Sequence, residues 1–234
     1  MSASILPVIV LIGIVFLNPS NDHASKPKAI NQKPNVKSLK KDSQSQHIKS
    51  PRQKEKANDL PVKSVELEGS SMNDAKEYRS IFEFITNRFK KVSTSDAEKI
   101  AKYLVKYGKE HGIDPKFAAA VIARESAFNK QAESKTGAKG LGQIKDFNFP
   151  DLNINDPYDI RQNVSGTTNY LKKMLNYWKV HSKKTSLALA SYYKGPNAVR
   201  RMKGDVDTET ENYVKDIMKY YDDIKRVRVK YGQL

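Results

Sequence analysis

The spacing of apolar side chains divides this chain of 234 residues into three stretches. Residues 5–17 form an uninterrupted apolar run, whereas residues 18 to about 65 have almost no large apolar side chain. From residue 72 onward, apolar residues recur every three or four positions, which is the period of an amphipathic α-helix. The pattern predicts a hydrophobic segment over residues 1–20, a linker over residues 21–70 and a helical domain over residues 71–234.

Local start and stop signals predict the first three helices of the domain. The apolar face of the first helix is formed by Tyr78, Ile81, Phe82, Ile85 and Phe89. The pattern Ser95-x-x-Glu98 is a capping box, which predicts the start of a second helix that ends near residues 108–112. An Asp-Pro pair at residues 114–115 predicts the start of a third helix. Because the third helix, FAAAVIARE, is apolar nearly all round, we expect it at the centre of the domain.

The second half of the domain combines one long loop with further helices. Residues 126–157 lack a helical period and contain three glycines, so we expect a loop or a short β-like excursion. Helical stripes return over residues 160–178, 186–194 and 213–227, and Gly195-Pro196 ends the second of them. No stretch shows convincing two-residue alternation. The predicted fold class is therefore all-α.

The N-terminal apolar run is short for a membrane span, which needs roughly 20 apolar residues, and it suits the core of a signal peptide better. However, the preceding MSAS carries no Lys or Arg, and no clean A-x-A cleavage site follows. We therefore predict a membrane anchor or a poorly cleaved signal. Its orientation stays open, because the nearby lysines all follow the run and would disfavour export of what comes next.

The linker is rich in Pro, Lys, Ser, Asn and Gln. Such a segment buries too little apolar surface to offset its ordering entropy, so we expect a disordered, basic tether. The whole chain carries a net charge of +16, which favours anionic partners such as acidic lipids, wall polymers or nucleic acid. It contains no recognisable DNA- or RNA-binding motif, so specific nucleic-acid binding is not expected.

Several kinds of chemistry are disfavoured by composition. The chain has no cysteine, which excludes disulfides, thiolate metal sites and a cysteine nucleophile. Its four histidines are widely spaced and never paired at helical spacing, so no metal site is expected. No serine lies in a nucleophile-elbow sequence.

Glu125 is the first candidate catalytic residue. It lies at the end of the most apolar helix, just before a loop of small and polar residues. Apolar surroundings penalise the charged carboxylate, so such a group keeps its proton to higher pH, as a general acid requires. The alternative is structural: Glu125 pairs with Arg124 or caps the helix end.

Aromatic residues are frequent after residue 165, and they include Tyr170, Tyr177, Trp178, Tyr192, Tyr193 and Tyr213. Such rings have an apolar face and a polar edge, so they can pack on sugars and bond hydroxyls. For Trp178 and Tyr170 we favour an ordinary core position. The adjacent pair Tyr192-Tyr193 points in two directions on a helix, so one ring should lie near the surface of a cleft.

Five short sequence blocks resemble the signature of family 1 (Slt-type) lytic transglycosylases. Residues 125–129 read ESAFN, and residues 132–134 read AES. Residues 137–144 read GAKGLGQI, residues 188–196 read ALASYYKGP, and residues 209–214 read ETENYV. The resemblance covers about residues 95–220, in the family's order and with compatible spacing. It implies a lysozyme-like α-helical domain that binds glycan in a cleft between two lobes.

The resemblance also implies roles for individual residues. Glu125 matches the family's catalytic glutamate. The substrate-binding or supporting positions are Ser134, Gln143, Tyr192, Tyr193, Glu209 and Tyr213. Gly142 departs from the family pattern, since many members have methionine there, and Thr167 stands in the register of a glycine. The forms G-L-G-Q-I and Y-Y-x-G are more like the small members attached to secretion or conjugation machines, or to phage particles.

The implied reaction cleaves the β-1,4 bond between N-acetylmuramic acid and N-acetylglucosamine in peptidoglycan. It forms a 1,6-anhydro ring with one glutamate as acid and base, and the resemblance implies that it needs no metal or cofactor. Two alternatives stay open. A goose-type lysozyme would hydrolyse the bond with a second acid, for which Asp146, Asp151 and Asp156 are candidates. A non-catalytic peptidoglycan-binding assembly factor would not cleave it.

The implied partners and location follow from the same resemblance. The resemblance implies the peptidoglycan glycan strand as partner, whereas attachment to a membrane is predicted from the N-terminal apolar run. Secretion, conjugation or virion components are further candidate partners. The expected location is the cell envelope, on the periplasmic side of the inner membrane, or a virion.

Overall fold

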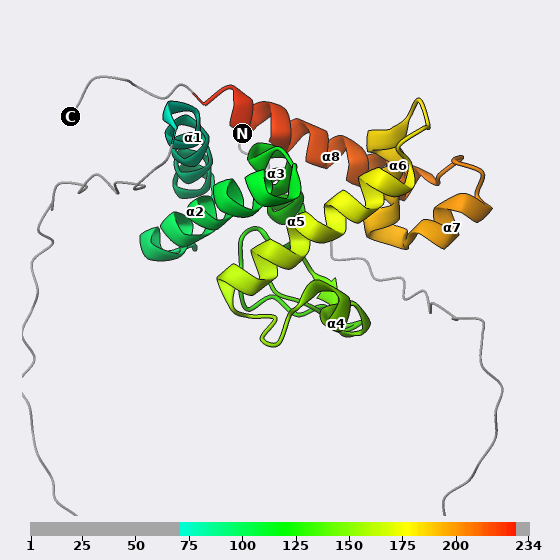
Figure 1. Cartoon of the computed structure of the whole chain (residues 1–234), viewed down its shortest axis with the longest axis horizontal. Helices are drawn as coiled ribbons and strands as arrows, with labels where there is room; N and C mark the ends of the chain where they lie inside the picture. The colour runs from blue at the N-terminus through cyan, green and yellow to red at the C-terminus, as the bar shows by residue number, and fades with distance from the viewer. Residues whose placement is uncertain (1–70, 228–234) are drawn as a thin grey trace, which may run out of the picture. The chain divides into compact units, whose positions relative to one another are not determined.

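The structure is a computed structural model that describes residues 71–227. Its elements are α1 (Met72–Arg88), α2 (Thr94–His111), α3 (Pro115–Ser126), β1 (Ala138–Lys139), β2 (Ile144–Lys145), the 3-10 turn η1 (Asp146–Asn148), α4 (Phe149–Leu152), α5 (Ile160–Tyr177), α6 (Lys184–Lys194), α7 (Pro196–Arg201) and α8 (Thr208–Lys225). Helices dominate, as Figure 1 shows, and the all-α prediction is confirmed. The segments predicted over residues 1–20 and 21–70 lie outside the described residues.

Polar side chains cap the helix starts, although not always where the sequence pattern suggested. Helix α2 begins after Ser93, whose hydroxyl accepts a hydrogen bond from the amide of Asp96. The capping box assigned to Ser95 and Glu98 is therefore wrong by two residues, because Ser93 offers an equivalent hydroxyl one position ahead of the helix. Asp114 caps α3 with Pro115 in its first turn, as predicted. The sequence reading missed the capping box at the start of α1.

Helix α3 lies at the centre of the helical packing, as its composition predicted. Every residue from Phe117 to Ala123 is buried. The helix packs against α8 and α2, and Figure 1 shows it among α1, α2, α5 and α8. A helix with apolar residues all round has no solvated face, so it must be enclosed by its neighbours.

The backbone turns sharply where α3 ends. Ala127 and Phe128 both adopt left-handed conformations, with φ of 50° and 59°. Such conformations are unfavourable for residues with a side chain. The Phe128 ring is only 2% exposed and packs edge-on against Phe89, with ring centroids 5.0 Å apart. This aromatic packing holds the strained turn in place directly after Glu125 and Ser126.

The segment predicted as a loop over residues 126–157 contains the expected short β-like excursion. It also contains the helical turns η1 and α4, which are too short to give a helical period and were not predicted. Strands β1 and β2 pair antiparallel, with Ala138 opposite Lys145 and Lys139 opposite Ile144. Gly140 ends β1 with φ of 74°, and a Cβ there would lie 2.1 Å from the carbonyl oxygen of residue 157. Only glycine satisfies both constraints. The hairpin is thereby held against the segment that leads into α5.

Within residues 71–227, no helix is both long and apolar enough to cross a membrane. The apolar run at residues 5–17 is not among the residues described.

Candidate active site

Glu125 lies one residue before the end of α3, where the buried helix reaches the surface. Its side chain is half-buried. Burial raises the pKa of this carboxyl from its ordinary value of 4.5 to about 7, while a hydrogen bond from Tyr213 and the charge of Arg124 act in the opposite direction. Desolvation dominates because it penalises only the charged form. A carboxyl with this pKa can both donate and accept a proton near neutral pH.

Tyr213 of α8 holds one oxygen of this carboxyl. Its hydroxyl donates to Glu125 Oε1 across 2.5 Å, and the ring is 1% exposed. Burial and the neighbouring Glu125 keep the pKa of Tyr213 well above its ordinary value, so the hydroxyl remains a donor. Among residues 71–227, no hydrogen bond engages the second oxygen of Glu125.

Arg124 does not form an ion pair with Glu125. Its Nε lies 3.1 Å from Asp216 Oδ2, and its guanidinium lies over the Tyr213 ring, 5.4 Å from the centroid. The structural alternative, in which Glu125 serves Arg124 as a salt-bridge partner, is therefore not the arrangement seen. Arg124 instead packs on the tyrosine that orients Glu125.

Tyr193, Glu209 and Lys194 form a polar network beside Tyr213. The rings of Tyr193 and Tyr213 stack with centroids 4.6 Å apart. The Tyr193 hydroxyl donates to Glu209 Oε1 across 2.9 Å. Lys194 Nζ lies 3.0 Å from Asp207 Oδ2 and 3.7 Å from Glu209 Oε2, and its side chain is only 6% exposed. These contacts link the C-terminal end of α6 to the start of α8, and they hold in place the Tyr193 ring that stacks on Tyr213.

Tyr192 is buried and supports the loop after β1. Its hydroxyl donates to the Gly142 carbonyl oxygen across 2.7 Å. A Cβ at Gly142 would lie 1.9 Å from Thr167 Oγ1 and 2.9 Å from the Tyr192 hydroxyl. Two of the positions that depart from the family pattern, Gly142 and Thr167, are thus neighbours: the missing side chain at 142 leaves the space that the Thr167 side chain fills. Of the adjacent tyrosines, Tyr193 is the half-buried one.

Gln143 and Ser134 lie on the β1–β2 hairpin and its approach. Gln143 has φ of 50°, and its amide nitrogen donates to the carbonyl oxygens of Ala132 (3.1 Å) and Gly140 (3.0 Å). The Ser134 hydroxyl accepts from the amide of Ala138 across 2.9 Å. Both side chains therefore stabilise the hairpin backbone. The structure gives neither of them a contact with Glu125.

Asn163 is a supporting residue that the sequence reading missed. It is fully buried on α5, accepts from the Gly142 amide across 2.8 Å and donates to the carbonyl oxygens of Lys139 and Pro157. These bonds attach the hairpin to α5. The only sequence signal was a polar residue on the apolar stripe of a helix, which is too common to identify a role. Lys194, at the end of an apolar helix, was missed for the same reason.

The three loop acids considered as a second catalytic carboxylate have local roles or none. Asp146 accepts from the next amide in the chain, and Asp156 accepts from the amide of Tyr158. Asp151 is exposed on α4. No contact joins any of them to Glu125 within the described part of the chain. The carboxylate linked to Glu125, through two stacked tyrosines, is Glu209.

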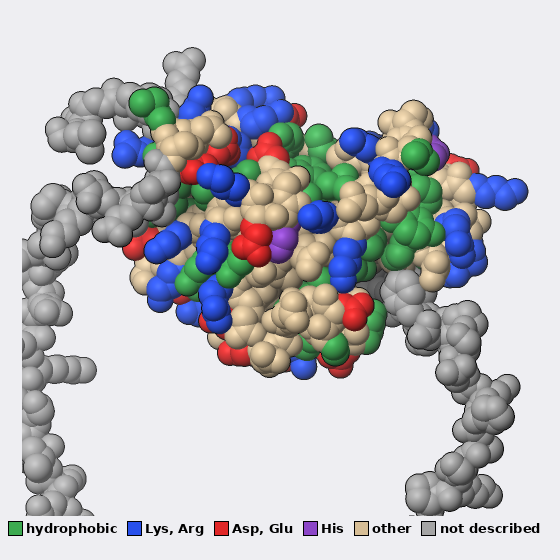
Figure 2. Space-filling model, in the orientation of Figure 1, with side chains coloured by type: hydrophobic (Ala, Val, Ile, Leu, Met, Phe, Trp, Pro, Cys, Tyr) green, Lys and Arg blue, Asp and Glu red, His purple; other side chains and the backbone are tan. Residues whose placement is uncertain are grey.

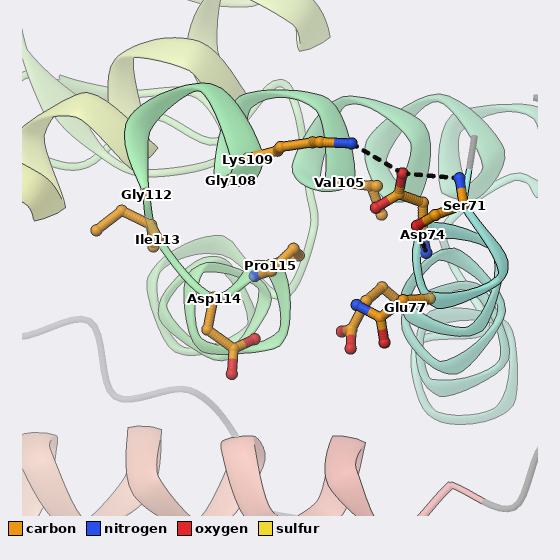
Figure 3. Close-up of a pocket in the computed structure, with 11 residues that line it drawn as sticks. Ser71, Asp74, Glu77, Val105, Gly108, Lys109, Gly112, Ile113, Asp114 and Pro115 are labelled. Atoms are coloured by element: carbon orange, nitrogen blue, oxygen red, sulfur yellow. Dashed lines mark hydrogen bonds and ion pairs between the residues drawn. The ribbon is translucent and has the colours of Figure 1, made fainter. Parts of the chain in front are cut away.

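A groove of about 520 Å³ lies between α1, the end of α2 and the start of α3 (Figure 3). None of the sequence-predicted site residues lines it. Its acidic groups are already engaged: Asp74 with Lys109, Glu77 with Lys116, and Asp114 with the Tyr221 hydroxyl. Over residues 71–227, no cluster of His, Asp and Glu has the arrangement of a metal site. The groove therefore offers no set of free ligand groups.

Comparison with known proteins points to one family. Residues 102–215 match the family model described as the transglycosylase SLT domain. Over 93 residues the chain is 38% identical to membrane-bound lytic murein transglycosylase F of Desulfosudis oleivorans. This match covers 38% of this chain and 20% of that protein. Over 111 residues it is 29% identical to the transglycosylase of Enterobacteria phage PRD1. This match covers 47% of this chain and 38% of the phage protein.

Two solved structures are also similar to this chain. An inactive variant of the lytic transglycosylase Slt from Pseudomonas aeruginosa is 24% identical, with a TM-score of 0.45 over 50% of this chain and 22% of that one. The 70 kDa soluble lytic transglycosylase of Escherichia coli is 20% identical, with a TM-score of 0.48 over 65% of this chain and 30% of that one. The matches to the two curated relatives cover only a fifth to two fifths of those proteins' lengths.

Proposed function

We infer the function from one premise: residues 102–215 of this chain match the transglycosylase SLT domain. We propose that it is a peptidoglycan lytic transglycosylase that cleaves the β-1,4 bond between N-acetylmuramic acid and N-acetylglucosamine and forms 1,6-anhydro-N-acetylmuramic acid. The observation that supports this most is Glu125, a half-buried carboxyl with a pKa raised to about 7, which one tyrosine hydroxyl orients within that domain.

In the proposed reaction, Glu125 acts first as an acid and then as a base. The protonated carboxyl donates its proton to the glycosidic oxygen, and the bond from C1 of the muramic acid breaks with its electron pair on that oxygen. The substrate's own N-acetyl group stabilises the positive charge at C1. The Glu125 carboxylate then removes the proton from the 6-hydroxyl, whose oxygen bonds to C1. The proton returns to Glu125, and no water is consumed.

The pKa of Glu125 suits both halves of this cycle. With a pKa of about 7, roughly half of the molecules carry the proton at neutral pH. One oxygen is fixed by Tyr213, so the other is the oxygen we assign to both proton transfers. A single base that is regenerated needs no second carboxylate, and the local bonds of the loop acids are consistent with that.

The other predicted residues divide into two proposed roles. We assign Tyr213, Glu209 and Tyr192 to support, because their polar atoms are engaged with Glu125, with Tyr193 and with Gly142. Tyr193 is the half-buried one of the two adjacent tyrosines, and an aromatic ring with a polar edge can pack on a sugar, so we propose that Tyr193 contacts the glycan. We propose that Ser134 and Gln143 shape the hairpin beside the bound glycan. We also propose that both contact the glycan through the parts of their side chains that do not bond the hairpin backbone.

The proposed setting is the cell envelope. The segment at residues 1–20 is proposed to attach the protein to a membrane, and the basic linker at residues 21–70 to let the catalytic domain reach the wall. The relatives' names, one membrane-bound and one from a phage, agree with an envelope or virion location. We place the domain on the periplasmic side.

Turbidity loss of a peptidoglycan suspension tests the assignment of Glu125. Full-length protein in detergent should clear the suspension, and Glu125→Gln should lower the rate by at least about 100-fold, the usual value of one acid/base group. Glu211→Gln is the matched control, because it makes the same change at an exposed position on α8. Near-normal clearing by a folded Glu125→Gln protein would exclude the proposed role.

A further inference from the structure

The charge of the domain is distributed very unevenly. No Asp or Glu occurs between Asp159 and Asp205, a stretch that contains all of α5, α6 and α7. The same stretch contains Arg161, Lys172, Lys173, Lys179, Lys183, Lys184, Lys194, Arg200, Arg201 and Lys203. By contrast, α1, α2 and α8 carry both signs, often as ion pairs. One part of the domain is therefore exclusively positive.

Nearly all of these cations are at the surface. Lys194 is the buried one, Lys172 is half-buried, and the other eight are exposed. In Figure 2, Lys and Arg side chains flank a hydrophobic area over α6 and α7. Lys194 pairs with Asp207 and Glu209, but none of the other nine cations forms an ion pair among residues 71–227, so their fields add.

An apolar tip projects from this basic region, at the turn between α5 and α6. Val180 is 92% exposed and Tyr177 is 43% exposed, and they are two of the four large hydrophobic residues that are exposed among residues 71–227. Every residue from 179 to 184 is exposed, including three lysines. Trp178 lies beneath the tip, where its indole nitrogen donates to Ser191 Oγ across 2.8 Å.

We propose that this tip and the basic surface around it form a second membrane-docking site, which binds an anionic lipid surface. Lysines beside an exposed aliphatic residue and an amphipathic aromatic ring match the bilayer interface. There the cations meet lipid phosphates, while Tyr177 and Val180 enter the headgroup region. A polyanion such as DNA would satisfy the charges but would give no reason for an exposed Val180.

Docking at this tip fixes the position of the candidate active site. Helix α6 begins at the tip and ends at Tyr192, Tyr193 and Lys194. Its 11 residues span roughly 16 Å at 1.5 Å per residue. The tip therefore holds the Glu125 site at a set height and orientation over the bilayer, which attachment at the N-terminal segment alone would not do. The docking site itself does not depend on the proposed reaction.

The single tryptophan of the chain, Trp178, makes the docking site directly observable. Full-length protein is mixed with vesicles of phosphatidylglycerol and phosphatidylcholine whose acyl chains are brominated or not. Bromine on the acyl chains quenches only an indole held close to the bilayer. Trp178 lies directly beneath the tip and is held there when the tip docks, whereas insertion of the N-terminal run by itself leaves Trp178 unquenched. We expect quenching with anionic vesicles, and its loss in phosphatidylcholine alone or at high salt.

Variants separate the two contributions of the site. Lys183→Gln/Lys184→Gln should weaken vesicle partitioning of the tip by roughly 30-fold, and Val180→Asp should abolish the quenching. The matched controls Lys102→Gln/Lys106→Gln and Met72→Asp make the same changes at exposed positions on α2 and α1 and should leave the quenching intact. Bound but unquenched protein would overturn the proposal. So would equal quenching in neutral lipid, or salt-dependent DNA binding that Val180→Asp leaves unchanged while vesicles fail to quench.

Discussion

Replacing Glu125 by glutamine should make the protein more stable at alkaline pH and leave its stability near pH 4 little changed. The carboxyl has a pKa of about 7 in the folded protein and 4.5 as its ordinary value. Between these two values the folded protein binds more protons at Glu125 than the unfolded chain does, so stability falls as pH rises across this window. The full difference corresponds to about 3 kcal/mol. Because the side chain partly reaches solvent, we expect about 2–3 kcal/mol.

Urea unfolding of both proteins at intervals from pH 4 to pH 8.5 measures this effect. The quantity to follow is the difference in unfolding free energy between Glu125→Gln and the unmodified protein, because other titrating groups cancel in it. That difference should grow in favour of glutamine up to pH 7 and then level off. Glu211→Gln gives the baseline for removing an exposed charge. A constant difference would refute the reasoning, and a difference of opposite sign would mean that the Tyr213 bond outweighs burial.

Three further changes test the surroundings of this carboxyl. Tyr213→Phe removes a hydrogen bond that lowers the pKa of Glu125. The pH at which kcat/KM falls on the alkaline side should therefore rise by about one pH unit. An unchanged pH of this fall would contradict its assignment to Glu125. Gly142→Ala should lower the free energy of unfolding by about 1–3 kcal/mol, measured by thermal or urea unfolding. Adding Thr167→Ala should recover part of that loss in the double variant. Additive losses would show that the two residues do not pack against each other. Lys194→Met should lower the free energy of unfolding by about 1–2 kcal/mol, because solvent can hydrate the carboxylates of Asp207 and Glu209 that lose their partner. That is less than a broken buried ion pair usually costs. A loss of 4 kcal/mol or more would show that the two carboxylates depend on Lys194 instead.

Local signals in the sequence predicted most of the helices. The Asp114-Pro115 start, the apolar third helix and the stop at Gly195-Pro196 are all present in the structure. These features depend on residues within a few positions of one another, so a pattern along the chain captures them. The position of the second cap was wrong because three candidate residues, Ser93, Thr94 and Ser95, are adjacent.

Contacts between distant segments could not be predicted in the same way. The bond between Tyr213 and Glu125 joins residues 88 positions apart, and it exists because α8 packs on α3. The packing of Thr167 into the space above Gly142 likewise depends on how α5 meets the hairpin. The sequence suggested each residue as unusual or important, but the partner of each emerged only from the packing. The buried Lys194 and Asn163 gave no signal distinct from ordinary polar positions.

The central claim is that Glu125 closes a 1,6-anhydro ring without water. It is tested most directly by digesting purified peptidoglycan with full-length protein in H₂¹⁸O and determining the masses of the released muropeptides. The account predicts products one water lighter than hydrolysed ones, with no ¹⁸O, and none from Glu125→Gln. Reducing-end products that carry ¹⁸O would contradict it and would indicate a hydrolase with a second catalytic group.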